Sequence, residues 1–355
     1  MCAEVAARAP GRINLIGEHT DYNLGWVLPA AIELSATATV TARARRRLRF
    51  ASAQFPDAVE FPLDAAAFAA PAPHWSDSLR GIAVLLDRIK PMPGADVLVA
   101  SSVPIGAGLS SSAAVEVACA LALARHAALE LEPAALAQLC QRASHEFAGS
   151  RVGIMDFYIA AHARAGHVVV LDTRDLAARW LPWPGSAALL AADSGTRHQH
   201  ATGDYNLRRA ECEAAARALG VAALRDATPA MLAAAAATLD PTLLRRARHV
   251  VTENARVLEA AAAIECGQLV RLGRLLNASH ASLRHDFEVS CPQLDRLAER
   301  CQRAPGVWGA RMMGGGFGGS VLVLGEPAAL AALAAQLGSP CWPVHPSAGA
   351  ALLPA

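Results

Sequence analysis

The feature that most constrains the fold is the segment at residues 101–115, which reads SSVPIGAGLSSSAAV. The apolar run at 95–100 that precedes it predicts a β-strand, and the alanine-rich run at 113–123 that follows it predicts a helix. Gly106 and Gly108 allow the backbone to turn tightly and to come close to a ligand. The segment therefore predicts a glycine-rich loop that leads from a strand into the start of a helix.

Three consecutive serines follow these glycines at the predicted helix start, namely Ser110, Ser111 and Ser112. Hydroxyl groups there cap free backbone N–H groups, and a helix N-terminus behind a glycine-rich loop favours a bound phosphate. The pattern is neither the Walker motif nor the dinucleotide motif G-x-G-x-x-G. An ordinary glycine loop with a serine cap is the alternative, but three serines exceed what a cap requires. We therefore interpret the segment as a phosphate loop.

A second polar segment lies near the start of the chain, at residues 10–29, PGRINLIGEHTDYNLGWVLP. It brings Arg12, Glu18, His19 and Asp21 close together in the sequence. Buried carboxylates and imidazoles need hydrogen-bond partners, and the hydroxyl groups of a sugar supply them. A polar turn after a short strand is the alternative. The segment favours a sugar-binding site.

The third feature is the glycine-rich stretch at residues 314–319, GGGFGG, between apolar runs at 307–313 and 320–324. Five glycines in six positions indicate that the backbone approaches another group closely or turns where no side chain fits. A flexible turn between two strands is the alternative interpretation.

Length and composition limit the class of protein. A chain of 355 residues exceeds the usual single-domain size and predicts two domains. The net charge of +1 gives no electrostatic reason to expect nucleic acid or an anionic membrane as a partner. The eight cysteines contain no C-x-x-C pair, so we expect reduced thiols in a cytoplasmic protein. Neither a signal peptide nor an apolar run long enough to cross a membrane is evident.

The remaining pattern mixes strands and helices. Alternating or apolar runs predict further strands at 37–43, 48–53, 167–171 and 188–192. Helices are expected at 109–127, 133–148 and 327–337, and the chain from about 203 to 303 is nearly all helical in pattern. The proline-rich composition at 181–185 predicts a domain boundary there, and 65–73 predicts an exposed loop.

Together these segments resemble the GHMP kinases and, within that family, the galactokinases. Residues 10–29 look like the galactokinase signature, 101–115 like the family's phosphate loop, and 314–319 like its C-terminal glycine motif. Two further stretches agree with the resemblance. Residues 152–156, VGIMD, resemble the segment that carries the catalytic aspartate, and 279–295 are similar to a galactokinase-specific stretch.

The resemblance implies an α+β fold of two domains. Residues 1–184 would form an N-terminal domain like ribosomal protein S5 domain 2, and residues 185–355 a ferredoxin-like C-terminal domain, with the site between them. The implied activity is ATP-dependent phosphorylation of the C1 hydroxyl of D-galactose, with Mg²⁺, to give α-D-galactose 1-phosphate and ADP. The alternatives are a kinase for L-arabinose or galacturonate and a catalytically weak sugar sensor. Protein partners are not indicated.

The resemblance also assigns roles to individual residues. Asp156 would be the catalytic base and Arg12 its partner; a helix N-cap is the alternative role for Asp156. The sugar-contacting residues would be Glu18, His19, Asp21, Gly153 and Tyr205. The ATP-binding residues would be Trp75, Gly106, Ala107, Gly108, Leu109, Ser110, Ser111 and Ser112, with Ser112 also a Mg²⁺ ligand. A buried core role is the alternative for Trp75, and a packing role for Tyr205.

Three positions depart from the galactokinase pattern. Ser144 stands where the family usually has a glutamate that binds Mg²⁺, so we expect the ion to be held mainly by ATP, water and Ser112. The nearby Glu146 points elsewhere on a regular helix, since two positions correspond to about 200° of rotation. Phe157 and Met313 replace the usual glutamine and threonine. His198 and His200 resemble a metal pair, but their spacing favours a polar loop.

Overall fold

A computed structural model describes residues 4–63, 74–197 and 201–354 of the chain. Its N-terminal part is a six-stranded sheet with the order β13-β1-β3-β6-β4-β5. These strands are β1 (Glu4–Asn14), β3 (Pro29–Arg43), β4 (Arg47–Ser52), β5 (Val59–Pro62), β6 (Gly94–Ser101) and β13 (Ala351–Leu352). The pair β4–β6 is parallel, and the other pairs are antiparallel.

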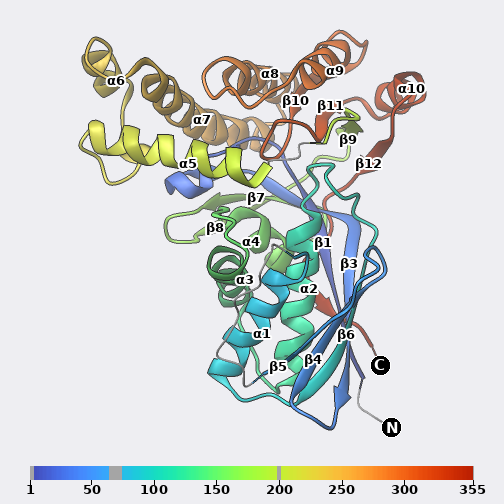
Figure 1. The fold of residues 1–355 in the computed structure, drawn as a ribbon. Helices are drawn as coiled ribbons and strands as arrows, with labels where there is room; N and C mark the ends of the chain where they lie inside the picture. Colours follow the sequence, from blue (N-terminus) through green and yellow to red (C-terminus); the bar gives the residue numbers. More distant parts are fainter. Residues whose placement is uncertain (1–3, 64–73, 198–200, 355) are drawn as a thin grey trace.

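Four helices cover one face of this sheet (Figure 1). They are α1 (Asp77–Ile89), α2 (Ser111–His126), α3 (Pro133–Phe147) and α4 (Met155–His162). Alternate residues of β3, including Ala36, Ala38 and Val40, are fully buried, as a strand with one face on a core requires. The small alanine side chains of α2 let this helix pack against both β1 and β3. The phosphate-loop helix is therefore the central helix of the N-terminal core.

The C-terminal part contains a four-stranded antiparallel sheet with the order β10-β11-β9-β12. Its strands are β9 (Ala188–Asp193), β10 (Val307–Met312), β11 (Ser320–Gly325) and β12 (Cys341–Val344). A small third sheet joins β2 (Trp26–Val27), β7 (His167–Asp172) and β8 (Ala178–Pro182). In Figure 1 this third sheet lies between the two larger parts of the molecule.

Helices make up most of the chain between β9 and β10. They are α5 (Ala201–Ala218), α6 (Pro229–Ala235), α7 (Pro241–Glu265), α8 (Leu269–His285) and α9 (Pro292–Gln302), with α10 (Pro327–Leu337) after β11. Two short 3₁₀ helices are η1 (Asp21–Asn23) and η2 (Leu224–Asp226). The start of α7 shows how the sequence sets a boundary: Asp240 accepts hydrogen bonds from the N–H groups of Thr242 and Leu243, and Pro241 occupies the first turn.

One buried core joins the two parts of the molecule. It combines Ile13 and Leu28 from the N-terminal strands with Val257 of α7, Leu322 of β11 and Met313. The last strand, β13, also returns to pair with β1 in the N-terminal sheet. The two parts therefore do not separate cleanly at one point of the chain, and the division between residues 184 and 185 stays a prediction.

The α+β class expected from the sequence is confirmed, and the predicted strands and helices are present with shifted ends. The helix expected at 109–127 begins only at Ser111, because the backbone of Ser110 is left-handed with φ 59° and ψ 47°. The loop expected at 65–73 lies outside the described residues, so it stays a prediction. Within the described ranges, no helix has the length and apolar character needed to cross a membrane.

Candidate active site

A cavity of about 560 Å³ lies where the two parts of the molecule meet, and residues of all three sequence segments line it. Its wall includes residues from the sugar-binding segment, the phosphate loop and the glycine-rich stretch. The lining residues from these segments include Arg12, Glu18, His19, Asp21, Gly106, Gly108, Ser110, Ser111, Ser112, Gly314, Gly315 and Gly316. Asp156 and Tyr205 also line it.

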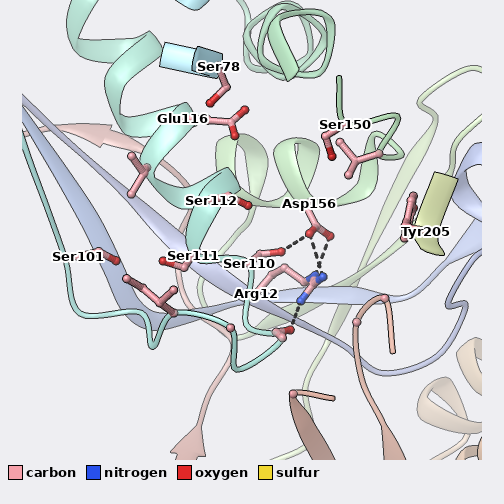
Figure 2. Close-up of a pocket in the computed structure, with 18 of the residues that line it drawn as sticks. Arg12, Ser78, Ser101, Ser110, Ser111, Ser112, Glu116, Ser150, Asp156 and Tyr205 are labelled. Carbon is pink, nitrogen blue, oxygen red and sulfur yellow. Dashed lines mark hydrogen bonds and ion pairs between the residues drawn. The ribbon is translucent and has the colours of Figure 1, made fainter. Parts of the chain in front are cut away.

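At the centre of this cavity, Arg12 and Asp156 form a two-pronged ion pair (Figure 2). The Arg12 Nε donates to Asp156 Oδ1 at 2.7 Å, and its Nη2 donates to Oδ2 at 2.9 Å. Nη1 donates to the carbonyl of Gly108 at 2.6 Å, which ties the guanidinium to the phosphate loop. The pair joins residues 144 positions apart in the chain, one on β1 and one in the first turn of α4.

Asp156 is not the N-cap of α4, because that position belongs to Ile154. Its side chain is 29% exposed and faces the cavity, whereas that of Arg12 is only 6% exposed. The hydroxyl of Ser110 also donates to Asp156 Oδ2. Three donor groups thus fix the carboxylate in one orientation while leaving it accessible to a ligand.

The guanidinium of Arg12 remains charged in this buried position. Burial lowers the pKa of Arg12, but the charge of Asp156 and, more weakly, that of Glu18 outweigh burial, and the net pKa is raised. A buried cation that is held next to the phosphate loop can stabilise negative charge that develops during group transfer.

The glycine-rich stretch at 314–319 packs directly against the phosphate loop. A Cβ on Gly108 would lie 3.1 Å from the carbonyl oxygen of Met313, and one on Gly319 would lie 3.5 Å from the backbone of Ala107. Ser320 completes the contact by donating its hydroxyl to the carbonyl of Ala107 at 2.7 Å. Of the two interpretations from the sequence, close backbone approach is the one that the structure shows.

Glu18 is buried, and its partner is a residue that sequence reasoning missed. Arg311 of β10 is fully buried and donates to Glu18 Oε1 at 2.8 Å, while the N–H of Gly314 donates to the same oxygen at 2.8 Å. Arg311 also donates to the carbonyls of Asn14 and Leu15 at 2.6 Å each. An arginine in an otherwise apolar strand was the available signal, since a buried charge requires a partner.

His19 is held as a neutral ring against aromatic neighbours. Its backbone is left-handed with φ 64°, and its Nδ1 shares a 2.9 Å hydrogen bond with the hydroxyl of Tyr22. The ring centroid lies 4.6 Å from that of Phe287 and 5.4 Å from that of Tyr205. Burial, together with the neighbouring His249, lowers the pKa of His19 to about 3. The imidazole therefore offers hydrogen bonds, not charge, to a ligand.

Asp21 and Gly153 form a matched pair. A Cβ on Gly153 would lie 1.7 Å from Asp21 Oδ2, so only glycine leaves room for this carboxylate. Asp21 accepts from its neighbour Tyr22 N–H at 2.9 Å and from Met155 N–H at 3.4 Å. Burial, and then the charge of Asp156, raises the pKa of Asp21 to about 6. Tyr205 closes this side of the cavity from α5, and its ring also packs edge-on against Tyr22 at 5.3 Å.

Elsewhere in the cavity wall, Trp75 forms an aromatic surface with Phe55, a residue that the sequence reasoning missed. The rings of Phe55 and Trp75 stack with centroids 5.5 Å apart and planes 10° apart, and both line the cavity. Trp75 also packs against the N-terminal core, so both interpretations of this residue are compatible with its position. Its Nε1 is buried and has no hydrogen-bond partner among the described residues.

The oxygen atoms that could bind a metal ion near the start of α2 differ from those expected from the sequence. Ser112 is exposed to the cavity, but Ser144 is buried and donates its hydroxyl to Glu116 Oε2 at 2.7 Å. The described lining includes Glu116 and not Ser144. Glu146 is exposed and binds Arg142 at 2.6 Å, as the helical geometry predicted. Glu116 was missed, although its position one helical turn after Ser112 was a signal.

Ser112 and Glu116 present hard oxygen ligands to the same region of the cavity, and this donor set suits a Mg²⁺ ion that is also bound by phosphates. Burial raises the pKa of Glu116 to about 7, with the hydroxyls of Ser144 and Ser78 acting in the opposite direction. In the part of the chain that is described, no group of three or more His, Cys, Asp or Glu side chains could hold a metal by itself.

The other departures from the pattern are explained by packing. Phe157 belongs to the N-terminal core, and Met313 belongs to the core that joins the two parts and also borders the cavity. His198 and His200 lie outside the described residues, so their interpretation as a polar loop stays a prediction.

Comparison with known proteins identifies the family of this chain. The GHMP kinase N-terminal domain matches residues 78–164, the GHMP kinase C-terminal domain matches 258–341, and a galactokinase galactose-binding signature matches 2–42. The galactokinase of Chloroflexus aurantiacus is 46% identical over 324 residues, which cover 90% of this chain and 83% of that protein. The galactokinase of a Roseiflexus species is 44% identical over 328 residues, with 91% and 83% coverage.

The structure is similar to that of Lactococcus lactis galactokinase complexed with galactose, with a TM-score of 0.92, 31% identity, and coverage of 99% of this chain and 95% of that one. A mevalonate kinase from Methanococcus jannaschii shares the fold, with a TM-score of 0.68, 16% identity, and 97% and 98% coverage. Fold and site thus define a GHMP kinase. Within this family the chain belongs to the galactokinases.

Proposed function

We propose that this chain phosphorylates the C1 hydroxyl of D-galactose with ATP, and that Asp156 is the base that accepts the hydroxyl proton. The observation that carries the proposal is the Arg12–Asp156 pair, which lines the same cavity as the phosphate loop and the polar side chains of the sugar-binding segment. The galactose-binding signature over residues 2–42 supports the choice of sugar.

The proposed reaction is a direct phosphoryl transfer. The C1 oxygen of the sugar forms a bond to the γ-phosphorus of ATP while the bond between that phosphorus and the β–γ bridging oxygen breaks. The hydroxyl proton passes to the Asp156 carboxylate, and ADP leaves with the bridging oxygen. Arg12 and the N-terminus of α2 stabilise the negative charge on the transferred group.

The nucleotide occupies the loop from Gly106 to Ser112, with the adenine against the surface formed by Phe55 and Trp75. Ser112 contributes a hydroxyl ligand to Mg²⁺, which, when bound, neutralises charge on the phosphates. We also propose a cytoplasmic location, because the seven cysteines that the structure describes are all free thiols.

The sugar side of the cavity supports recognition of hydroxyl groups by Glu18, His19, Asp21 and Tyr205. A site with buried, oriented polar groups rejects an analogue that leaves them without partners. Glucose differs from galactose only at C4, so it tests this recognition most stringently.

The test is a coupled assay of ADP release over galactose, glucose, L-arabinose and galacturonate, with ATP and Mg²⁺. We expect galactose to give the highest kcat/KM and glucose to be a poor substrate. Equal efficiency with glucose, or a preference for L-arabinose or galacturonate, would reject the galactose assignment. Absence of sugar-dependent ADP release, with sugar and ATP binding retained, would instead identify a sensor.

A further inference from the structure

Glu116 is a buried carboxylate that lines this cavity and has no role in the proposed reaction. It lies on α2, one helical turn after Ser112, and is 6% exposed. Residues four positions apart on a helix share one face, so the carboxylate and the Ser112 hydroxyl lie next to each other on the same side of α2. Figure 2 shows Glu116 beside Ser78, with Ser112 between it and Asp156.

The partners of Glu116 are hydroxyl groups. Ser144 of α3 donates to its Oε2 at 2.7 Å, and the side chain of Ser78 on α1 lies beside it in Figure 2. No arginine, lysine or histidine among the described residues forms an ion pair with it. Asp156, the other carboxylate in this half of the cavity, has Arg12 as its cation. A buried carboxylate is costly without a positive partner, so Glu116 lacks the group that would make its burial favourable.

The two other residues near the expected metal-ligand position, Ser144 and Glu146, already have other partners. The Ser144 hydroxyl is committed to Glu116 and is outside the described cavity lining. Glu146 is on the exposed face of α3 and pairs with Arg142. Of the described carboxylates close to the phosphate loop, Glu116 is therefore the one placed to meet a cation beside Ser112.

We propose that Glu116 supplies the protein carboxylate for the divalent cation that accompanies the nucleotide, together with the hydroxyl of Ser112. Ser144 is a positioning residue that orients this carboxylate through its hydrogen bond. Mg²⁺ usually binds one or two protein carboxylates in addition to substrate phosphates and water, and this site offers one. The inference rests on the proposed function only in placing the ATP phosphates at the loop from Gly106 to Ser112.

The proposal predicts two effects of opposite sign on nucleotide binding. At a pH above the pKa of Glu116, which burial raises to about 7, its negative charge repels the phosphates of ADP when no metal is bound. With Mg²⁺, the same charge favours the complex. Glu116→Gln, which keeps the size and a hydrogen-bond acceptor for Ser144, should therefore tighten ADP binding in EDTA and reduce the gain in affinity that Mg²⁺ provides.

The experiment is calorimetric titration of the full chain with ADP, in EDTA and in saturating Mg²⁺, without any sugar. The measured quantity is the Kd for ADP in EDTA divided by the Kd for ADP in Mg²⁺, which is the gain in affinity that Mg²⁺ provides. We expect Glu116→Gln to lower this ratio on the order of tenfold or more, and Ser144→Ala to lower it less, as the loss of an orienting contact does. Glu146→Gln is the matched control, because it removes the same charge from the exposed face of α3, and it should leave the ratio unchanged.

The proposal is wrong if Glu116→Gln keeps the wild-type ratio, if Glu146→Gln lowers it equally, or if the wild type shows no gain from Mg²⁺. Thermal unfolding of each variant confirms that it folds, and Glu116→Asp serves if the glutamine variant does not, with a reduced ratio expected from the shorter side chain. Binding of ADP requires no phosphoryl transfer, so failure of the galactose assay and failure of this test are distinguishable.

Discussion

At the scale of single residues, Asp156 carries the chemistry, because it is held by Arg12 and Ser110 and still faces the cavity. Asp156→Asn keeps the shape of the side chain but removes its ability to accept a proton. We expect kcat to fall by about 10²–10⁴, the effect of losing a general base, while calorimetry shows galactose binding retained. Turnover close to that of the wild type would mean that Asp156 has only a structural role.

Gly153 allows a second prediction at this scale. Gly153→Ala places a Cβ where the Asp21 carboxylate now lies, so Asp21 must move. Displacement of Asp21 should weaken its proposed hydrogen bonds to the sugar. We therefore expect KM for galactose to rise by roughly tenfold and KM for ATP to change little. Gly185→Ala is the control, since a Cβ there meets nothing within 4 Å. Equal changes in the two KM values would indicate general disturbance and not a sugar-side effect.

At the scale of elements, helix α8 and strand β10 approach each other through two glycines. A Cβ on Gly273 would lie 2.2 Å from the carbonyl oxygen of Trp308, and one on Gly309 would lie 2.1 Å from the carbonyl oxygen of Gly273. This contact fixes β10, which carries Arg311 and hence the orientation of Glu18. The packing of α8 therefore supports the sugar side of the cavity from outside it.

Gly273→Ala should lower the free energy of unfolding by about 1–3 kcal/mol, because the helix and the strand must separate to admit a methyl group. Gly203→Ala is a helical control with open space around it, and its stability should stay the same or rise by up to about 1 kcal/mol. Urea titrations of both variants measure the difference. Similar values for the two would contradict the close packing of α8 against β10.

The sequence predicted more of the elements than of the contacts between them. Periodicity and glycine placement located the phosphate loop and its helix, and a family resemblance paired Arg12 with Asp156. Arg311 was missed because its partner Glu18 is 293 residues away in the chain. Glu116 was missed because its hydrogen-bond partner, Ser144, belongs to another helix. The partner of a buried charge can be far away in the sequence, so identifying it requires the tertiary structure and not only the local sequence pattern.

At the scale of the whole molecule, buried neutral histidines make stability depend on pH. His280 accepts a hydrogen bond from Met312 N–H, and its Nε2 lies 3.4 Å from Asp295 Oδ1. Burial lowers the pKa of His280 to about 4, although the charge of Asp295 acts in the opposite direction. Between about pH 6.5 and 4 the unfolded chain therefore binds a proton at this site that the folded chain excludes.

The contribution of His280 to the free energy of unfolding should consequently fall with decreasing pH in this window, by roughly 1 kcal/mol per pH unit. His280→Gln should flatten the dependence by about that amount, even if it lowers stability at pH 7. Urea unfolding at several pH values measures both slopes. An unchanged slope in the variant would show that His280 does not stay neutral in the folded protein.

The most direct test of the central claim is identification of the product by ³¹P NMR. The purified chain is incubated with ATP, Mg²⁺ and galactose labelled with ¹³C at C1, in parallel with Asp156→Asn. We predict a sugar phosphate whose phosphorus signal is split by the labelled carbon, formed in equal amount to ADP, and nearly absent with the variant. Phosphate on another carbon, or ADP formed without a sugar phosphate, would contradict the assignment of this chain as a kinase of the C1 hydroxyl of galactose.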